Sequence, residues 1–213
     1  MAVLRFSLIS EADARRIEPG STVELEPGGM VTPLAADTLK ARRVTVVPAG
    51  TSDPSLPSDL APVSPVVRVA IGSDHSGVAL KAALITHLRQ SGRSVTDVGT
   101  TGSDPVDYPD IAGLVAQAVA RREADGGIVI DGAGLGSAIA ANKVRGVRAA
   151  MCTTPTLARY ARQHNGANVL TLGATLVDAA EAKEIVDVWL STPMSEARYV
   201  RRLLKVRRLE ERF

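Results

Sequence analysis

A glycine-rich stretch near the middle of the chain holds residue types that can do chemistry. Asp131 directly follows an apolar run over residues 127–130, and an alanine-rich, helical pattern begins at Ser137. Between them stand three alternate glycines, Gly132, Gly134 and Gly136. This order predicts a buried strand, a turn that no side chain crowds and the start of a helix. Backbone N–H groups at such a turn, helped by the helix dipole, would hold an anion or a developing oxyanion beside the Asp131 carboxylate.

The spacing of this loop separates it from two common nucleotide-binding loops. Gly-x-Gly-x-Gly differs from the Gly-x-Gly-x-x-Gly of a dinucleotide-binding turn. No Lys-Ser or Lys-Thr pair follows it, as one would in a phosphate-binding ATPase loop. A plain, tight connection from strand to helix remains the alternative interpretation.

The elements around the loop predict a sheet that would gather polar side chains at one edge. Strands are expected at 66–71, 94–98, 127–130, 147–151 and 168–172, and helices at 77–90, 108–122, 155–164 and 179–190. Repeated strand–helix units of this length indicate a parallel sheet covered by helices on both faces. Ligands of such sheets lie beyond the carboxyl ends of the strands. The residues at those predicted ends are Ser-Asp-His at 73–75, Asp-Tyr-Pro at 107–109, Asp131 with its glycines, and Thr153.

Composition excludes several classes of protein. The 213 residues are 45% hydrophobic but only 3% aromatic, which suits buried parallel strands of aliphatic residues. A net charge of +2 with both signs mixed argues against a general nucleic-acid binder. The single cysteine, Cys152, excludes a disulfide framework or a multi-cysteine metal site, and we expect it in the core. We find no signal peptide and no apolar run of about 20 residues, so we expect a cytoplasmic protein without a membrane segment.

Residues 1–47 predict a small α+β module of their own. Helices are expected from Ser10 and from Thr32 to Arg43, strands at 21–25 and 44–47, and a turn at 27–29. Residues 48–65 contain five prolines among small polar residues and predict an extended linker. Residues 66–213 form the predicted main domain.

The last segment predicts a basic, amphipathic helix. Its cationic residues alternate with apolar ones at helical spacing: Arg198, Arg201, Arg202, Lys205, Arg207, Arg208 and Arg212. Arg198 and Arg202 are one helical turn apart and could clamp a phosphate group. The alternative is an ordinary solvated helix face.

Five motifs occur in order between Val66 and about Leu209. They are Val-Ala-Ile-Gly-Ser-Asp-His-Ser-Gly at 69–77, Asp-Tyr-Pro at 107–109, the glycine loop with Ile-Ala-Ala-Asn-Lys at 139–143, Arg-Gln-His-Asn at 162–165 and Asn-Val-Leu at 168–170. Together they resemble the ribose-5-phosphate isomerase B family, which includes the galactose-6-phosphate isomerase subunits. The resemblance implies a Rossmann-like three-layer α/β/α sandwich with a five-stranded parallel sheet. It also implies a homodimer or tetramer with interface active sites, and aldose–ketose isomerisation of a phosphosugar, of the ribose 5-phosphate type, through an enediolate without metal or cofactor.

The same resemblance implies a role for each candidate site residue. Asp74 would bind sugar hydroxyls, and His75 would lie near the phosphate. His164 would help to open the sugar ring with Asn165 beside it, although a histidine near a helix end also serves as a charge partner for that end. The other substrate-binding residues would be Tyr108, the glycines Gly132, Gly134 and Gly136 with N–H groups for the enediolate, and Arg198 and Arg202 for the phosphate.

Four positions depart from the family pattern and concern the chemistry itself. Asp131 stands where ribose-type members have the catalytic cysteine, and Ser137 stands where a second branch has a glutamate. Thr175 replaces a common arginine and Tyr199 a histidine. An aspartate without that arginine is more similar to the A subunit of galactose-6-phosphate isomerase. A carboxylate is ionised at neutral pH and serves as base in other aldose–ketose isomerases, so Asp131 is either the catalytic base or part of a non-catalytic, phosphometabolite-binding subunit.

A second, shorter resemblance concerns residues 31–41, Val-Thr-Pro-Leu-Ala-Ala-Asp-Thr-Leu-Lys-Ala. They are similar to a segment of enzymes from bacterial microcompartments, including ethanolamine-utilisation proteins. The resemblance implies that residues 1–47 dock the main domain on an enzyme partner or in a microcompartment. An unrelated helix start is the alternative interpretation.

Overall fold

The chain divides into two compact units in the computed structural model, which describes residues 4–48, 59–194 and 196–212. The smaller unit comprises Met1–Ser58 and Ser195–Leu204, and the larger comprises Asp59–Met194 and Lys205–Phe213. Residues 49–58, most of the predicted linker, lie outside the described residues. The predicted boundaries of module, linker and main domain stay predictions.

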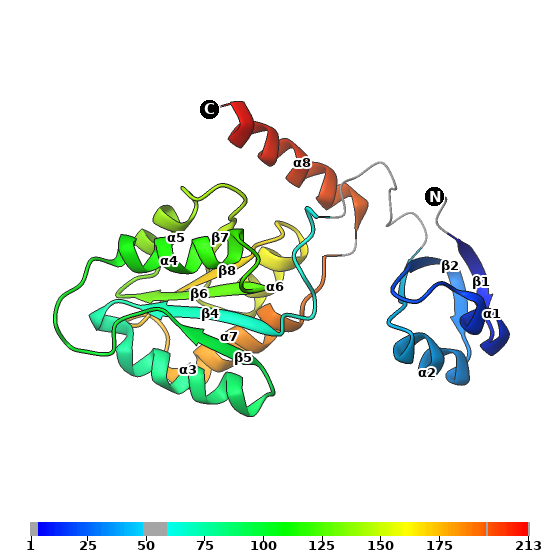
Figure 1. Cartoon of the computed structure of the whole chain (residues 1–213), viewed down its shortest axis with the longest axis horizontal. Coiled ribbons are helices and arrows are strands. Elements are labelled where there is room, and N and C mark those ends of the chain that lie inside the picture. The colour runs from blue at the N-terminus through cyan, green and yellow to red at the C-terminus, as the bar shows by residue number, and fades with distance from the viewer. Residues whose placement is uncertain (1–3, 49–58, 195, 213) are drawn as a thin grey trace. The chain divides into compact units, whose positions relative to one another are not determined.

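The larger unit is built on a five-stranded parallel sheet, as predicted (Figure 1). The strands are β4 (Arg68–Ser73), β5 (Ser94–Asp97), β6 (Gly126–Asp131), β7 (Ala149–Met151) and β8 (Val169–Gly173). Their order across the sheet is β5-β4-β6-β8-β7, and all neighbours are parallel. The carboxyl ends therefore meet at one edge, and the central strand β6 ends there on Asp131.

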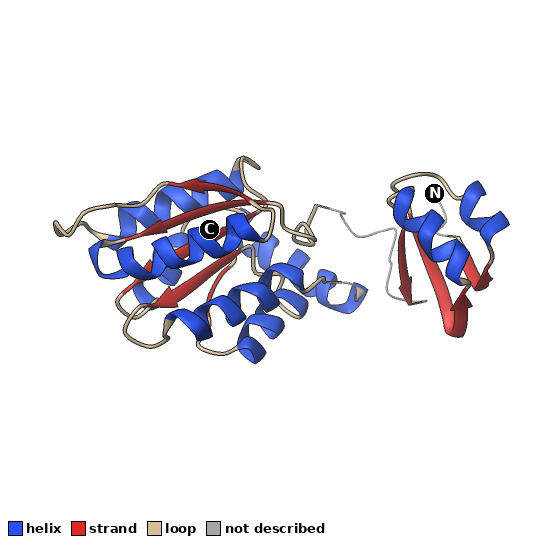
Figure 2. Cartoon of the chain, turned by 90° about the horizontal axis from the view of Figure 1, so that it is seen from below, coloured by secondary structure: helices blue, strands red, loops and turns tan. Residues whose placement is uncertain are grey.

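Helices cover both faces of this sheet, so the three-layer α/β/α prediction is confirmed (Figure 1, Figure 2). One face is covered by α3 (Val78–Gln90), α6 (Pro155–Gln163) and α7 (Ala179–Ser191), and the other by α4 (Tyr108–Ala120) and α5 (Leu135–Ala141). Strand residues alternate between two cores: Ile71 and Ile128 face the first group of helices, and Ala70 and Val129 face the second. Burial on both faces is why the strands read as continuous apolar runs.

The smaller unit contains a second parallel sheet, of order β1-β2-β3. Its elements alternate as β1 (Arg5–Ile9), α1 (Glu11–Arg16), β2 (Thr22–Val31), α2 (Pro33–Ala41) and β3 (Thr45–Pro48). The Ser10 side chain caps α1 in a capping box, and Thr32 caps α2 with Pro33 in its first turn. Both predicted helix starts are confirmed.

Two features of this unit differ from the sequence prediction. β1 has no counterpart among the predicted strands, although its first four residues, Arg-Phe-Ser-Leu at 5–8, alternate between polar and apolar. The prediction that residues 27–29 turn the chain is wrong, because β2 continues through them. The pairing with β1 is irregular there: Phe6 pairs with Leu25, but Leu8 pairs with Met30. Gly28, with φ of +77°, allows the chain to bulge there.

The helix predicted in the last segment is α8 (Ala197–Arg212). Its first half belongs to the smaller unit and its second half to the larger one. Tyr199 and Leu203 are buried, whereas Val206 and Leu209 are exposed. The apolar residues of this helix therefore do not all contribute to a core.

Candidate active site

The Asp131 carboxylate lies at the carboxyl edge of the sheet and is turned back onto its own glycine loop. Its side chain is buried, with the residue 4% exposed. Oδ1 accepts hydrogen bonds from the N–H groups of Ala133, at 2.8 Å, and Gly134. Oδ2 accepts from the N–H of Ser137 at 2.9 Å and from its Oγ at 2.5 Å. A carboxylate has about four acceptor positions, so this arrangement fills them.

The loop nevertheless keeps N–H groups for a ligand. The N–H of Gly134, one of the three expected to face an enediolate, donates to Asp131. Among the described residues, the N–H groups of Gly132, Leu135 and Gly136 donate to no protein acceptor. They stand at the turn that begins α5, where the helix dipole favours negative charge. The predicted strand, glycine turn and helix start are thus present, and an anion could meet three donors there.

Tyr108 is brought directly against this loop from the start of α4. A Cβ added to Gly136 would lie 2.5 Å from Cζ of the Tyr108 ring, so only glycine lets the ring approach. Gly134 has φ of +76° and would clash with the backbone of Leu172 if it carried a side chain. Two of the three predicted glycines therefore have identified steric reasons.

Asp74 and His75 reach the same edge from the end of β4. The Asp74 N–H donates to the carbonyl of Ile130 at 3.1 Å, which joins the ends of β4 and β6. Asp74 Oδ1 accepts from the N–H of Ser76 at 2.9 Å and from its Oγ at 2.6 Å. The exposed His75 ring accepts at Nδ1 from the Val106 N–H at 3.3 Å, which leaves Nε2 to carry a proton.

His164 and Asn165 lie at the opposite edge of the sheet. α6 starts beyond the carboxyl end of β7, and the chain returns to the amino end of β8. Consistent with this, Arg148, which directly precedes β7, donates from Nε to the carbonyl of Gly166 at 2.8 Å. His164 ends α6 and stacks on Tyr160, with ring centroids 4.8 Å apart. The five-residue strand β8, about 16 Å long, separates this edge from the one that holds Asp131.

Arg198 and Arg202 are on the half of α8 that belongs to the smaller unit. Arg198 pairs with Glu196 at 2.6 Å, and this partner raises the pKa of its guanidinium. Both arginines lie over the Tyr199 ring, at 4.7 and 5.6 Å from its centroid. The two stack on one aromatic ring, and their role with phosphate stays a prediction.

Two threonines support the glycine loop through hydrogen bonds that the sequence does not predict. Thr175 donates from its N–H and Oγ1 to the carbonyl of Gly132, at 3.1 and 2.7 Å. Thr171 is fully buried and donates from Oγ1 to the carbonyl of Gly134 at 2.7 Å. Thr171 is the one polar residue in the apolar run of β8 and is buried. A polar residue in such a run is a sequence signal for a buried hydrogen bond. The contact of Ser137 with Asp131 does not follow from the sequence pattern.

Three further features of the described residues concern metal ligands, the cysteine and the length of the helices. They contain no group of three or more His, Cys, Asp or Glu side chains that could hold a metal ion. Cys152 is buried, as predicted, and burial raises the pKa of its thiol to about 11, so it is a poor nucleophile. In that same part of the chain, every helix is too short or too polar to cross a bilayer.

Known proteins are similar to this chain over most of the larger unit. A family described as Ribose/Galactose Isomerase matches residues 69–206. Ribose-5-phosphate isomerase B of Escherichia coli is 44% identical over 145 residues, which cover 68% of this chain and 97% of that protein. A sugar phosphate isomerase described as putative in Bacillus subtilis is 37% identical over 147 residues, covering 68% and 99%.

Solved structures agree with the fold. Ribose-5-phosphate isomerase B of Clostridium thermocellum has 46% identity and a TM-score of 0.68, covering 68% of this chain and 99% of that one. The enzyme of Mycoplasma genitalium, solved with bound ribulose-5-phosphate, has 40% identity and a TM-score of 0.67, covering 69% and 98%. The family match begins at residue 69 and leaves residues 1–47 without a counterpart in it. With its parallel five-stranded sheet and its glycine loop at the carboxyl edge, the chain belongs to the ribose/galactose isomerase family.

Proposed function

We propose that this chain interconverts an aldose phosphate and a ketose phosphate, ribose 5-phosphate and ribulose 5-phosphate, through an enediolate. The observation that carries the proposal is the carboxylate of Asp131 beside the free N–H groups of its loop, at the edge where this fold binds ligands. The names of the relatives, one of them solved with ribulose-5-phosphate, support this substrate class.

In this reaction a base removes the proton from the carbon next to the carbonyl. The electron pair moves onto the carbonyl oxygen. A proton then passes from the hydroxyl of the deprotonated carbon to that oxygen, and the proton held by the base is returned to the former carbonyl carbon, so that the new carbonyl stands on the deprotonated carbon. The N–H groups of Gly132, Leu135 and Gly136 would bind the oxyanion as it forms. Asp131 would be the base, and the Ser137 hydroxyl would rotate off Oδ2 to uncover a lone pair for the proton. Asp74, His75 and Tyr108 would bind the sugar phosphate at the same edge.

A complete site would take His164 and Asn165 from a second copy of the chain, because one copy holds Asp131 and His164 at opposite edges. Exposed apolar side chains flank both places: Leu157 and Tyr160 on α6, and Leu135 and Ile139 on α5. Such side chains are usually covered in an assembly. We therefore include a homodimer, or a tetramer built from it, in the proposal.

The proposal is tested by turnover of ribose 5-phosphate with purified full chain and with Asp131→Asn, for which we expect no turnover. Asp37→Asn, at an exposed carboxylate of the smaller unit, is the matched control and should be fully active. Mixing equal amounts of inactive Asp131→Asn and inactive His164→Ala should restore about a quarter of the activity, since half of all dimers become mixed and each mixed dimer has one intact site of two. No restoration after subunit exchange would contradict a shared site.

The second candidate is a subunit that binds a phosphosugar without turnover, similar to the A subunit of galactose-6-phosphate isomerase. The four hydrogen bonds that already fill the Asp131 carboxylate favour it. This candidate would be supported if calorimetry showed that the chain binds ribose 5-phosphate without turnover, and if turnover occurred only after a partner subunit was added.

We further propose that the first 47 residues dock the enzyme on a partner, in the cytoplasm or inside a bacterial microcompartment. They have a core of their own, around Ile9, Ile17 and Leu39, while Leu8 and Met30 are exposed. A chain that begins at Asp59 should keep its oligomeric state and activity and lose the partner. Loss of solubility or of oligomerisation would contradict the docking role.

A further inference from the structure

The connection between β5 and α4, residues 98–107, borders the carboxyl edge of the large sheet and is here named the β5–α4 loop. Its first part is held firmly. Lys81 of α3 is buried and donates from Nζ to Asp97 Oδ1 and to the carbonyl of Thr100, both at 2.7 Å. The Thr100 N–H donates in turn to the carbonyl of Ser73, the last residue of β4, at 3.1 Å. The loop therefore starts from a fixed point beside the end of β4.

The far end of the β5–α4 loop is fixed as well. The loop ends before Tyr108, the first residue of α4, whose ring lies against Gly136 of the glycine loop. Between these two ends the loop is mostly exposed. Within the described part of the chain, residues 101–106 make one hydrogen bond to another element, from the Val106 N–H to His75 Nδ1 at 3.3 Å. This bond joins the exposed part of the loop to a residue of the candidate site.

The donor in this bond decides which form of the His75 ring fits. A ring nitrogen that accepts a hydrogen bond carries no proton, so the proton of a neutral ring must be on Nε2. A backbone N–H cannot accept in exchange, and both the other tautomer and the doubly protonated ring would set two N–H groups against each other. The loop thus favours a neutral imidazole that donates from Nε2. The ring is exposed at the edge of the sheet that also holds Asp131, and no described residue accepts from Nε2.

We propose that the Val106 N–H is a positioning group for phosphate binding: it holds His75 in one tautomer, so that Nε2–H donates to a phosphate oxygen of the substrate. This rests on the proposed function, in which His75 binds the sugar phosphate. Phosphate oxygens only accept hydrogen bonds at neutral pH, so a bare Nε2 facing them would repel them. The β5–α4 loop, anchored at both ends, supplies the fixed donor that prevents this.

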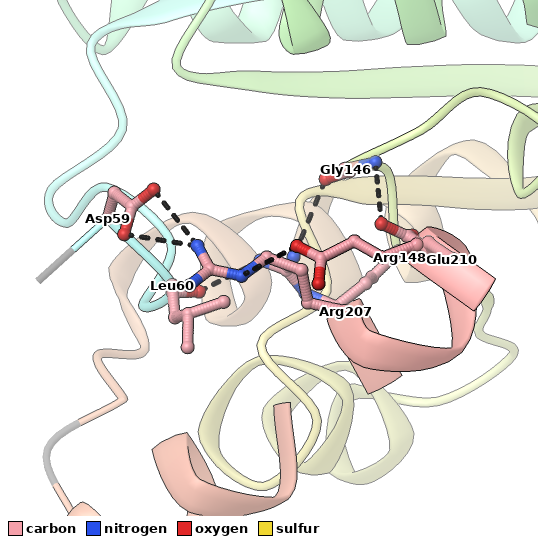
Figure 3. Close-up of polar contacts among 7 residues, drawn as sticks. Asp59, Leu60, Gly146, Arg148, Arg207 and Glu210 are labelled. Carbon is pink, nitrogen blue, oxygen red and sulfur yellow. Dashed lines mark hydrogen bonds and ion pairs between the residues drawn. The ribbon is translucent and has the colours of Figure 1, made fainter. Parts of the chain in front are cut away.

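The test uses two pairs of variants in the full chain. Val106→Pro removes the N–H, and Val106→Ala keeps it as the matched control. His75→Asn keeps an acceptor near the position of Nδ1 but has no donor near that of Nε2, whereas His75→Gln keeps a donor there and loses the acceptor. Asp59→Ala removes an exposed ion pair with Arg207, at 3.3 Å elsewhere in the larger unit, and controls for the loss of a polar contact (Figure 3).

Three measurements are made on each protein. Nitrogen-15 NMR of the histidine rings at about pH 8.5, where a free imidazole is neutral, shows which ring nitrogen carries the proton. The chain has three histidines, so a spectrum of His87→Gln helps to assign the signals. Turnover of ribose 5-phosphate gives KM and kcat, and calorimetry gives the Kd of inorganic phosphate.

We expect His75 to carry its proton on Nε2 in the unaltered chain, in Val106→Ala and in Asp59→Ala. In Val106→Pro the proton should be shared between both ring nitrogens. KM and the phosphate Kd should then rise together by about two- to tenfold, the range for one hydrogen bond, with kcat unchanged. His75→Asn should raise both values more than His75→Gln, because the donor at Nε2 is the group that binds.

The reverse order, with His75→Gln worse than His75→Asn, would overturn the proposal, since the ring would then serve to hold the loop. A proton on Nδ1 in the unaltered chain would overturn it too, as would a changed tautomer in Val106→Pro with unchanged KM and phosphate Kd. If Val106→Pro failed to fold, the order of the two His75 variants would still decide. If the unaltered chain had no turnover, the isomerase proposal would fail, while the phosphate Kd and the NMR spectra would still test the role of the loop.

Discussion

Removal of the Ser137 hydroxyl tests how the Asp131 carboxylate is held. In Ser137→Ala the carboxylate loses the 2.5 Å bond from Oγ but keeps three N–H donors. A hydrogen bond to a charged group contributes about 1.5–3 kcal/mol, and Ser137 is fully buried, so no water replaces the hydroxyl without rearrangement. We expect the free energy of unfolding in urea to fall by that amount. Ser94→Ala, at an exposed serine of β5, should change it little.

The same variant separates two views of the site. If Asp131 is the base, the missing hydroxyl frees a lone pair on Oδ2, and kcat for ribose 5-phosphate should not fall. A kcat at least tenfold lower in a folded variant would refute this reasoning, because the hydroxyl would then take part in catalysis. A stability loss below about 0.5 kcal/mol would refute the hydrogen bond itself.

Further predictions concern the packing and the buried charges. Gly136→Ala should cost about 1–3 kcal/mol of unfolding free energy by pushing on the Tyr108 ring 2.5 Å away, and a second change, Tyr108→Ala, should relieve it. Arg162→Met leaves the carbonyls of Ala167 and Val63 unpaired and should cost about 2–6 kcal/mol of unfolding free energy, whereas Arg159→Met, exposed on the same helix, should cost little; equal losses would contradict the role of these two hydrogen bonds. Burial raises the pKa of the Cys152 thiol to about 11, above about 8.5 for an exposed thiol, so its contribution to stability is full below pH 8.5 and declines toward pH 11. Urea unfolding across that range should show a shallower decline in Cys152→Ala, and an identical decline would contradict it.

Much of the larger unit was predictable because its strands are apolar runs of ordinary length joined by helices. Asp131 was placed correctly at the end of the central strand, since that position follows from the sequence order alone. Its four hydrogen bonds were not predictable, because they depend on a side-chain rotamer and on how the turn folds. The opposite position of His164 could have been deduced, since a helix that leaves one edge of a parallel sheet must return to the other.

The smaller unit was harder to predict for reasons that lie in particular residues. Glycine and proline at 27–29 are typical of a turn, but the same residues also form a bulge that a strand passes through. The contacts of Leu60 and Val63 with Arg148 and Arg162 could not be predicted, because they use backbone carbonyls, which every residue has. Side-chain types therefore say nothing about them.

The separation of Asp131 and His164 to opposite edges has an evolutionary consequence if two copies share each site. After a gene duplication, one product could lose its carboxyl-edge chemistry and the other its amino-edge histidine, and a mixed dimer would still contain one intact site. Selection would then act on the pair of genes together, and neither could be deleted without loss of activity. If Asp131 stands in place of a catalytic cysteine, as the family resemblance of the sequence implies, such a division of labour between paralogues would tolerate that change.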